Sequence, residues 1–419
     1  MPDNEGLPRG SKDLLPPAAA RRRALVAELL DAFAAWGYRQ VVTPTVERYD
    51  VLAAGLSEAD RASVVRFIAA QTSEVVALRS DVTPQIARMV GEHRGTTWPG
   101  SAVLRLSYTA DVVRQPSDAR ERAERHQVGV ELIGDGSPAA DAELVALSHA
   151  ALRRVGLSGF RFDLSHGGIA HGTLDALELD ASDRRDVEAL LARKDRGGIE
   201  ALLVGKGADA AAAATVGSLC NAYGRPAVLE RARETYDAPA AVEGLANLAA
   251  IGDHLAQVHP DAADVLDVDL GEVRGFDYYT GARLRVWAPG VAVPILRGGR
   301  YDDLIGRYGE RAAATGFALD LDALERALGH DERRADRAGR LVALRPDCPP
   351  EARTEGSRRA AAARGAGEGA WVQAGLTLAE AQTVAADAGA ATLTYLEPAA
   401  GGGLAVQRYR WSDSTWTAE

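Results

Sequence analysis

A long hairpin is the sequence feature that most constrains the fold. Residues 102–115 and residues 126–134 both have the composition of strands, and a charged, arginine-rich loop separates them. Further strand-like segments follow over 268–287, at the start of 293–309 and at the start of 314–328, with helical segments between the groups. Strands that come consecutively favour antiparallel pairing, because parallel neighbours need long crossover connections. The sequence therefore predicts an α+β fold in which helices flank an antiparallel sheet, and not a doubly wound fold.

Two further segments extend this module. Residues 172–265 are rich in Ala, Leu and Asp and have helical periodicity, so we expect a mostly helical insertion there. After a charged linker, residues 341–419 repeat a strand–helix–strand pattern, which predicts a small C-terminal α/β domain. The length of 419 residues and the hydrophobic content of 47% suit two or three domains with sizeable cores. We therefore expect one module over 1–330 and a separate domain over 341–419.

Charge and motif content exclude several functional classes. The net charge is −11, so nucleic-acid binding would require a local basic face. Cys220 and Cys348 are far apart, and neither the cysteines nor the histidines form a metal-ligand pattern. The sequence contains no signal-like or membrane-spanning stretch, no Walker loop, and no GxGxxG, GxSxG or HExxH motif. We expect a cytoplasmic protein without a metal, a cofactor, a membrane anchor or a nucleic-acid partner.

One strand of the hairpin carries a candidate ligand site. Alternation along 126–134 places Gln127, Gly129 and Glu131 on one face and apolar residues on the face toward the core. An amide and a carboxylate on either side of a glycine gap are typical of the floor of a small-ligand pocket. The alternative is a solvated sheet face without a ligand.

Asp81 and Thr83 form a second candidate site, immediately before a predicted helix. Thr83 suits the N-cap and Pro84 the first helical position, so helix capping alone would explain this stretch. The other interpretation is that the carboxylate and the hydroxyl bind the amine of a ligand.

Two glycine-rich segments hold further candidates. In RGFDYYTG, Arg274 could pair with a carboxylate or a phosphate, and Tyr279 could contact a planar ring. In LRGGRYDDLIGRYG, residues 296–309, the glycines predict a turn between a strand and a helix, and they would admit a ligand close to the backbone. The alternatives are a tyrosine-rich hairpin packed on the core and a tight turn without a ligand.

Several short motifs, in order along residues 5–330, carry a resemblance to a known family. PRGSKDLLPP, YRQVVTPTVE, DVVRQ with ERHQVGVELIG, RGFDYYTG, GGRYDDLI and GFALDLDAL together resemble the catalytic module of class II aminoacyl-tRNA synthetases, specifically the histidyl branch. The resemblance implies that family's antiparallel sheet flanked by helices and a homodimer formed through YRQVVTPTVE. It also implies a pocket for free L-histidine.

The resemblance implies roles for individual residues as well. Asp81 and Thr83 would hold the α-amino group of histidine, and Arg274 would face its carboxylate. Arg114 occupies the arginine position of the second motif and is placed in the same pocket. The imidazole end would be lined by Gln127, Glu131, Tyr278, Tyr279 and Tyr301.

Three positions depart from the pattern of an aminoacylating enzyme. The third motif has Ala323 where an arginine is usual and Asp320 where a glycine is usual. In the second motif, Pro116 stands in place of an acid. Adenylation needs preorganised cations at the phosphates, so these changes predict a chain without catalytic residues.

These departures resemble a paralogous family, the regulatory subunits of short-form ATP phosphoribosyltransferase. That resemblance implies a hetero-oligomer with the catalytic subunit, a requirement for activity in the first step of L-histidine biosynthesis, and allosteric feedback by histidine. Residues 341–419 contain no lysine and are shorter than a synthetase anticodon-binding domain, so they are either a reduced form of it or unrelated. The alternatives are a divergent histidyl-tRNA synthetase, another amino-acid-adenylating paralogue, and an accessory protein with a different partner.

Overall fold

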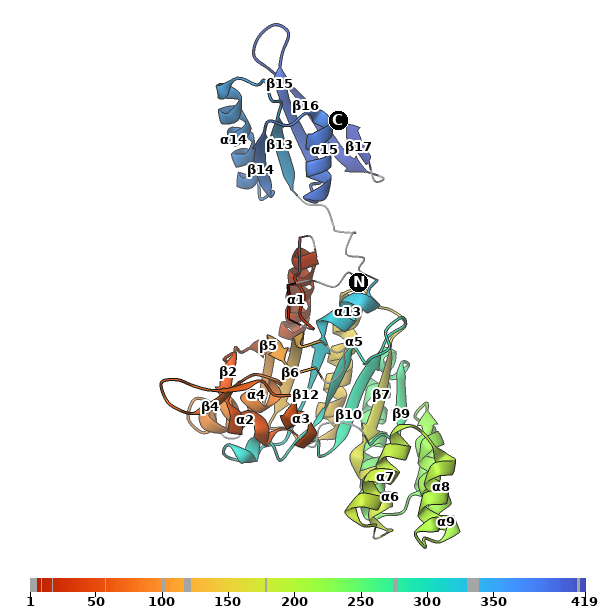
Figure 1. Cartoon of the computed structure of the whole chain (residues 1–419). Coiled ribbons are helices and arrows are strands. Elements are labelled where there is room, and N and C mark those ends of the chain that lie inside the picture. Colours follow the sequence, from red (N-terminus) through yellow and green to blue (C-terminus); the bar gives the residue numbers. More distant parts are fainter. Residues whose placement is uncertain are drawn as a thin grey trace. The chain divides into compact units, whose positions relative to one another are not determined.

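The computed structural model divides into two compact units (Figure 1). The first unit contains residues 1–12 and 25–329, and the second contains residues 13–24 and 330–419. The structure describes residues 6–8, 10–16, 18–56, 58–99, 102–116, 122–177, 179–273, 278–329, 339–412 and 415–419.

A nine-stranded sheet forms the centre of the first unit, in the order β1-β5-β6-β12-β11-β10-β7-β9-β8. Its neighbours are antiparallel except for β1 with β5 and β7 with β9, which are parallel. The prediction of an α+β fold with a mainly antiparallel sheet is confirmed, and the predicted hairpin is the pair β5–β6. The strands are β1 (Arg39–Gln40), β5 (Leu104–Val113), β6 (Glu124–Ile133), β7 (Arg161–His166), β8 (Tyr223–Gly224), β9 (Leu266–Asp269), β10 (Ala282–Trp287), β11 (Leu296–Arg300) and β12 (Ala314–Asp320).

Side-chain alternation gives this sheet two different faces. The apolar residues of β6 (Val128, Val130 and Leu132) join the large hydrophobic core on one face. That core is packed by residues 25–35 of α1 (Ala18–Ala35), by α5 (Pro138–Arg154) and by α11 (Pro239–Val258). On the other face, β5 contributes to a smaller core with α4 (Thr83–His93) and the 3-10 segment η2 (Ile305–Arg307). The polar residues of β6 lie on this second face.

A three-stranded sheet in the order β2-β4-β3 accompanies the large one. It consists of β2 (Val46–Arg48), β3 (Arg66–Ile68) and β4 (Val75–Leu78), with α2 (Tyr49–Ala54) and α3 (Glu58–Ala62) between the strands. This region and the segments beside it expose large apolar side chains, which include Val42, Val46, Phe67, Ile68 and Val75.

The chain between β7 and β9 is mostly helical (Figure 1). Aspartates start three of these helices: Asp180, Asp195 and Asp209 each accept hydrogen bonds from backbone N–H groups of the first helical turn. The remaining elements of this region, in addition to α11 and β8, are α6 (Gly167–Asp175), α7 (Ala181–Ala192), α8 (Arg196–Gly205), α9 (Ala210–Ser218), η1 (Leu219–Asn221), α10 (Val228–Thr235) and α12 (Pro260–Ala263).

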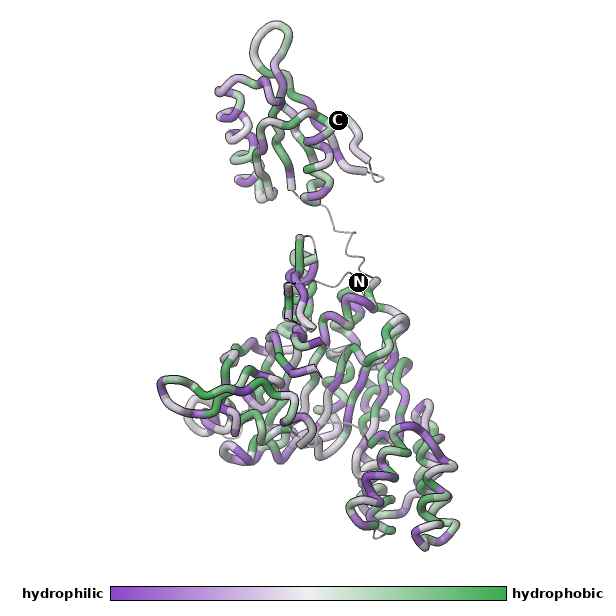
Figure 2. Tube along the Cα trace, viewed as in Figure 1, coloured by the Kyte–Doolittle hydropathy of each residue, from purple (hydrophilic) through white to green (hydrophobic). Residues whose placement is uncertain are grey.

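The second unit has its own five-stranded sheet, in the order β14-β13-β15-β16-β17. The strand β13 is parallel to both of its neighbours, whereas β16 is antiparallel to both of its own. Hydrophobic residues concentrate along the inner strands (Figure 2), and α14 and α15 pack against different faces of them. The elements are β13 (Arg340–Leu344), α14 (Pro350–Gly365), β14 (Ala370–Ala374), α15 (Leu378–Asp387), β15 (Thr392–Pro398), β16 (Leu404–Ser412) and β17 (Thr415–Ala418).

The predicted glycine turn after residue 296 is wrong. Gly298 and Gly299 lie inside β11, and only the short segment η2 follows where a helix was expected. A Cβ on Gly298 would lie 2.4 Å from the Gly316 carbonyl oxygen, and one on Gly299 would lie 2.9 Å from the Tyr279 ring. These glycines therefore permit close contacts across the sheet instead of a chain reversal.

Candidate functional site

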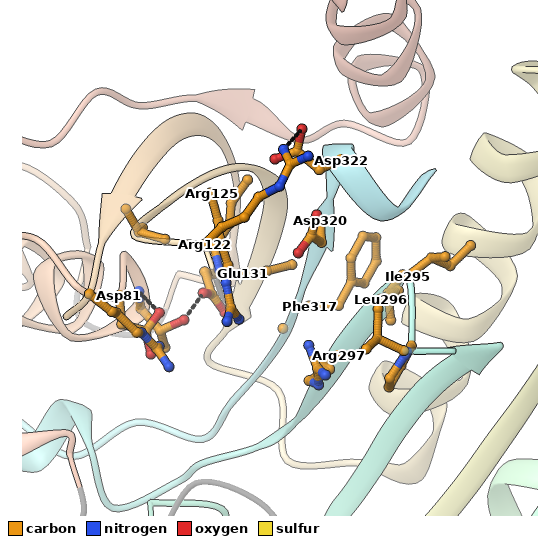
Figure 3. Close-up of a pocket in the computed structure, with 18 of the residues that line it drawn as sticks. Asp81, Arg122, Arg125, Glu131, Ile295, Leu296, Arg297, Phe317, Asp320 and Asp322 are labelled. Atoms are coloured by element: carbon orange, nitrogen blue, oxygen red, sulfur yellow. Dashed lines mark hydrogen bonds and ion pairs between the residues drawn. The ribbon is translucent and has the colours of Figure 1, made fainter. Parts of the chain in front are cut away.

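A cavity of about 490 Å³ lies over strands β6, β12 and β11 (Figure 3). This volume is within the range of small-ligand sites. One end, which we call the carboxylate end, is lined by Asp81, Thr83, Glu131, Tyr278, Tyr279 and Tyr301. The other end, which we call the arginine end, is lined by Arg122, Arg125, Arg297, Arg326, Asp320 and Asp322.

Strand register sets the polar floor of the cavity. Alternate residues of β6 face it, so Arg125, Gln127 and Glu131 follow one another along the floor. On β12, Gly316 lies opposite Glu131 and Asp320 lies opposite Gln127. Because a strand advances about 3.3 Å per residue, Arg125 and Glu131 are about 20 Å apart along β6. Arg125 and Glu131 are therefore distinct places on one strand, whereas Arg297 on β11 is level with Gly129, between them.

Glu131 is the central acid of the carboxylate end and is only 1% exposed. Its Oε1 accepts a hydrogen bond from the Thr83 hydroxyl at 2.7 Å, and its Oε2 accepts one from the Tyr301 hydroxyl. Burial raises the pKa of Glu131 to about 8, although both hydrogen bonds favour the ionised form. A Cβ on Gly316 would lie 1.7 Å from Oε2, so the carboxylate occupies its position only because residue 316 is glycine.

Asp81 is the second buried acid of this end. Its Oδ2 accepts a hydrogen bond from the Tyr278 hydroxyl at 3.2 Å, and its Oδ1 accepts one from the Thr83 backbone N–H at 3.4 Å. Burial raises the pKa of Asp81, and the charge of Arg114 acts against that rise. The Arg114 Nε donates to the Ser80 carbonyl at 2.8 Å. Arg114 is therefore held beside Asp81 and adds a positive charge to the carboxylate end of the cavity.

Three tyrosine rings form an aromatic wall beside these acids. The ring centroid of Tyr278 lies 4.9 Å from that of Tyr279 and 5.8 Å from that of Tyr301. Tyr278 and Tyr301 are both buried. The glycine gap expected on β6 is not open, because a Cβ on Gly129 would lie 2.5 Å from the Tyr108 hydroxyl. Aromatic rings thus fill much of the space above the glycines of the floor.

The arginine end includes the start of α13 (Leu321–Ala327), which follows β12 directly. Asp320 is the N-cap of this helix and accepts a hydrogen bond from the Ala323 backbone N–H at 2.9 Å. Asp322 forms ion pairs with Lys12 at 2.9 Å and with Arg122 at 2.7 Å. Ala323, at the position of the third-motif arginine, is fully buried. Acids, and not a cation, therefore face the cavity from the third motif.

The structure brings most of the predicted site residues together. Arg274 lies outside the described residues. Helix capping does not explain Thr83, because the N-cap of α4 is Val82 and the Thr83 hydroxyl bonds to Glu131. A solvated sheet face does not describe Glu131 either, since it is buried. The cavity is lined by all the other residues predicted for the pocket, namely Asp81, Thr83, Arg114, Gln127, Glu131, Tyr278, Tyr279 and Tyr301.

The arginine end lies outside the set of residues predicted from the sequence. Arg125 could have been predicted, because it lies two residues before Gln127 and therefore on the same face of the strand. Arg297 was obscured by the expected glycine turn, because only a continuous strand places its side chain on the cavity face. Arg122 belongs to the arginine-rich hairpin loop, which was not assigned to the pocket, and no local signal marks Arg326 on its helix. The residues missed are Arg122, Arg125, Arg297 and Arg326.

The chemistry of the site is that of binding a polar molecule. The Gln127 Oε1 is buried and has no hydrogen-bond partner in the part of the chain that the structure describes, so a ligand donor would satisfy it. Among the described residues, no three His, Cys, Asp or Glu side chains gather in a way that could hold a metal ion. Within the same ranges, no helix is long and apolar enough to cross a membrane.

Comparison with known proteins gives consistent matches in sequence. A family model described as histidyl-tRNA synthetase matches residues 10–324. An ATP phosphoribosyltransferase regulatory subunit of Anaeromyxobacter dehalogenans is 39% identical over 349 residues, which cover 81% of this chain and 98% of that protein. A protein with the same name from Desulfitobacterium hafniense is 40% identical over 319 residues, covering 76% of this chain and 80% of that protein.

Solved structures agree on the fold. An ATP phosphoribosyltransferase regulatory subunit/histidyl-tRNA synthetase of Bacillus halodurans matches with a TM-score of 0.80 and 26% identity, covering 96% of this chain and all of that one. A histidyl-tRNA synthetase of Nostoc matches with the same TM-score but only 16% identity, covering 99% of this chain and 97% of that one. At that identity the second likeness shows the fold alone.

Proposed function

This chain belongs to the family of ATP phosphoribosyltransferase regulatory subunits, and we propose that it acts as a non-catalytic subunit of that enzyme in the cytoplasm. In this proposal it binds a separate short-form catalytic subunit and is required for its activity in the first step of L-histidine biosynthesis. It also carries the feedback by histidine. The observation that carries the proposal is the match to a relative of that name over nearly its whole length.

We propose that free L-histidine binds at the carboxylate end. Asp81 and Thr83 offer a carboxylate and a hydroxyl to the α-amino group, and Arg114 adds a cation to the same pocket. Gln127 and Glu131 face the imidazole with an unsatisfied amide oxygen and a buried acid. A zwitterion with a polar ring needs this combination of an acid, a base and groups that can both donate and accept hydrogen bonds.

Histidine feedback requires that the ligand binds one state of the complex more tightly than another. The Glu131 network supplies a physical basis for such a difference. Thr83 begins α4, and Tyr301 follows β11, so a ligand that changes the Glu131 hydrogen bonds acts on both segments at once. Tyr278, Tyr279 and Tyr301 line the same end and offer aromatic rings to the ring of the ligand.

We propose that the chain does not adenylate histidine. The transition state of adenylation builds negative charge on the phosphate, which an enzyme stabilises with preorganised cations. At the third motif the charged side chains that line the cavity are Asp320 and Asp322, while Ala323 is buried and does not line it. The third motif therefore supplies no cation for the charge that the reaction must develop.

We further propose that the chain pairs with a second copy of itself and has no nucleic-acid partner. The exposed apolar residues in and beside the three-stranded sheet support a homodimer, with Val42 at 82% and Ile68 at 69% exposure. The net charge of −11 opposes binding of a phosphate backbone.

Reconstitution with a short-form catalytic subunit tests the main proposal. The purified chain is mixed with that subunit, and the ATP- and phosphoribosyl-pyrophosphate-dependent reaction is followed with and without histidine. We expect co-elution of the two proteins, at least about tenfold more activity than the catalytic subunit alone, and inhibition by histidine. Histidine-dependent ATP–pyrophosphate exchange by the chain alone serves as the parallel assay, and we expect none. Robust exchange, or no co-elution and no activation, would overturn the proposal.

A further inference from the structure

A second cavity, of about 270 Å³, lies over the strands β10, β7 and β9 (Figure 1) and reaches the edge strand β8 of the large sheet. None of the described residues that line it also lines the central cavity. Two of its aromatic side chains are exposed, Tyr223 at 57% and Trp287 at 36%. Exposed rings around a small cavity are typical of a binding site. The lining residues are Gly159, Arg161, Phe162, Asp163, Tyr223, Asp267, Trp287, Ala288 and Pro289.

The acid Asp163 of β7 differs from its charged neighbours in having no counter-ion. Directly opposite it in the sheet lie Asp267 of β9 and Arg285 of β10, whose side chains share its face. Asp267 is paired with Arg161 at 2.7 Å, and Arg285 is paired with Glu272. Among the described residues, Asp163 forms no ion pair, and its Oδ1 is buried without a hydrogen-bond partner. A buried carboxylate oxygen without a partner is costly, so a donor from outside the chain would stabilise it.

The charges around Asp163 also favour an additional cation. Burial is the main cause that raises the pKa of Asp163 to about 6, and the charges of Asp269 and Glu272 contribute to the rise. The charge of Arg285 and a hydrogen bond from the Trp287 side chain act in the other direction, but they do not cancel it. A cation in the cavity would therefore compensate an excess of negative charge.

The aromatic side chains give the cavity a second property that suits a cation. Trp287 lies beside the Asp163 carboxylate, to which it donates. Burial and the charges of Asp267 and Asp163 raise the pKa of Tyr223, so this ring also lies near both carboxylates. In the ranges that the structure describes, no Arg or Lys side chain lies over the face of either ring. The faces of Trp and Tyr attract cations, and a planar guanidinium can stack on a ring while it bonds to a carboxylate.

We propose that this second cavity binds a guanidinium group, with the Asp163 carboxylate as its counter-ion and the Trp287 ring as the surface on which it stacks. The group would donate hydrogen bonds to the Asp163 carboxylate, and Tyr223 would approach it from β8. A free small molecule and an arginine side chain of a protein partner share this chemistry. The proposal does not rest on the histidine site or on the regulatory role, because the two cavities have no lining residue in common among those described.

Titration of the full-length chain labelled with fluorotryptophan tests this site, because fluorine NMR reports on each tryptophan separately. The chain has six tryptophans, and the Trp287 signal is identified by its loss in Trp287→Phe. The probes are L-argininamide, L-citrullinamide, in which a neutral urea replaces the guanidinium, and the peptide acetyl-Gly-Arg-Gly-amide. The variant is Asp163→Asn, which removes the charge and keeps the shape. Asp387→Asn removes an exposed acid of α15 in the second unit and is the matched control.

We expect L-argininamide to shift the Trp287 signal with a dissociation constant of about 1 mM, and L-citrullinamide to bind at least about tenfold more weakly. Asp163→Asn should weaken the binding of L-argininamide at least about tenfold, and Asp387→Asn should change it less than about twofold. Tighter binding of the peptide would identify an arginine side chain of a protein as the ligand, and equal or weaker binding would identify a free small molecule; both support the proposal.

If Asp163→Asn fails to fold, the comparison of L-argininamide with L-citrullinamide on the wild-type chain still decides. The proposal is overturned if L-argininamide leaves the Trp287 signal unchanged at about 20 mM, or if L-citrullinamide binds as tightly as L-argininamide. It is also overturned if Asp387→Asn weakens binding as much as Asp163→Asn does.

Discussion

The two ends of the cavity differ in whether their charged side chains have partners within the protein. At the carboxylate end, hydroxyl groups of Thr83, Tyr278 and Tyr301 already donate to the two buried acids. At the arginine end, Arg125 and Arg297 face the same space with no ion pair among the described residues. In the first arrangement both acids already accept hydrogen bonds, so a ligand has to compete with these internal hydrogen bonds. In the second arrangement, the guanidinium groups of Arg125 and Arg297 can form ion pairs with an anion without first breaking an internal ion pair.

This contrast predicts different responses to mutation and pH at the two ends. The largest effect concerns the protonation of Glu131. Its pKa is about 8 in the folded chain and 4.5 ordinarily, so between these values the native state binds one proton more than the unfolded state. We expect this group to lower the free energy of unfolding by up to about 1.4 kcal/mol for each pH unit gained, or about 4 kcal/mol from pH 5 to pH 8.

The measurement is denaturant unfolding across that pH range for the wild-type chain and for Glu131→Gln. Because other acids also titrate, the contribution of Glu131 is the difference between the two slopes. Glu92→Gln, which removes a half-exposed carboxylate of α4, is the control for the loss of one acid. If the free energy of unfolding of Glu131→Gln depends on pH as in the wild-type chain, Glu131 is ionised in the folded chain. The proposed contrast between the two ends would then be wrong.

The second prediction concerns a steric clash at the carboxylate end. In Gly316→Ala the new Cβ would lie 1.7 Å from the Glu131 Oε2, so the carboxylate has to leave its position. We expect histidine affinity to fall at least about 100-fold, or about 2.7 kcal/mol, while the affinity for inorganic pyrophosphate, an anion that probes the arginine end, changes less than about threefold. Calorimetric titration with each ligand gives both values.

Gly252→Ala is the matched control for this change. Gly252 lies in α11 with open space around it, and alanine there should strengthen the helix without affecting either ligand. If Gly316→Ala binds histidine normally, histidine does not use the Glu131 carboxylate. If it loses both ligands equally, the two ends are not independent.

The smallest effect is expected at the arginine end. In Asp322→Asn, Arg122 and Lys12 lose their shared counter-charge, and the local positive charge increases by one. We expect pyrophosphate to bind about three- to fivefold more tightly and histidine affinity to stay unchanged. The free energy of unfolding should fall by about 1–2 kcal/mol, because both cations keep partial access to water.

Asp303→Asn removes an acid that pairs with Arg311 on the exposed surface, and it should change neither affinity. Differential titration of the two variants therefore separates the local charge from the net charge of the chain. Weaker pyrophosphate binding in Asp322→Asn would show that the Asp322 ion pairs hold the arginine end in its binding form instead of competing with the ligand.

Local periodicity was sufficient to predict the floor of the site. Alternation along β6 placed Gln127 and Glu131 on one face, and the structure has them there because each side of a strand meets a different core. The mainly antiparallel character of the sheet followed from consecutive strands, but its order did not, because β6 pairs with β12 and β7 pairs with β10. Burial of Glu131 did not follow, since it depends on Thr83 and Tyr301, which are 48 and 170 residues away in sequence.

The errors have a common physical origin in contacts between distant segments. Adjacent glycines are typical of turns, but Gly298 and Gly299 are continuous strand because Phe317 and Tyr279 need the space above them. Thr83 looked like a helix cap because Glu131, its real partner, is on another element. Arg297 went unnoticed for the same reason, as only the register of three strands shows that it enters the cavity without a partner.

The unpaired arginines also have a consequence for how fast a ligand arrives. The chain as a whole is negative, with a net charge of −11, whereas the arginine end is locally positive. An anion in solution is therefore repelled at long range and attracted only within about 8 Å, the Debye length at physiological salt. Added salt screens the repulsion and speeds the approach, but it also weakens the bound state. We therefore expect ionic strength to change both the association rate and the affinity of an anion, in opposite directions.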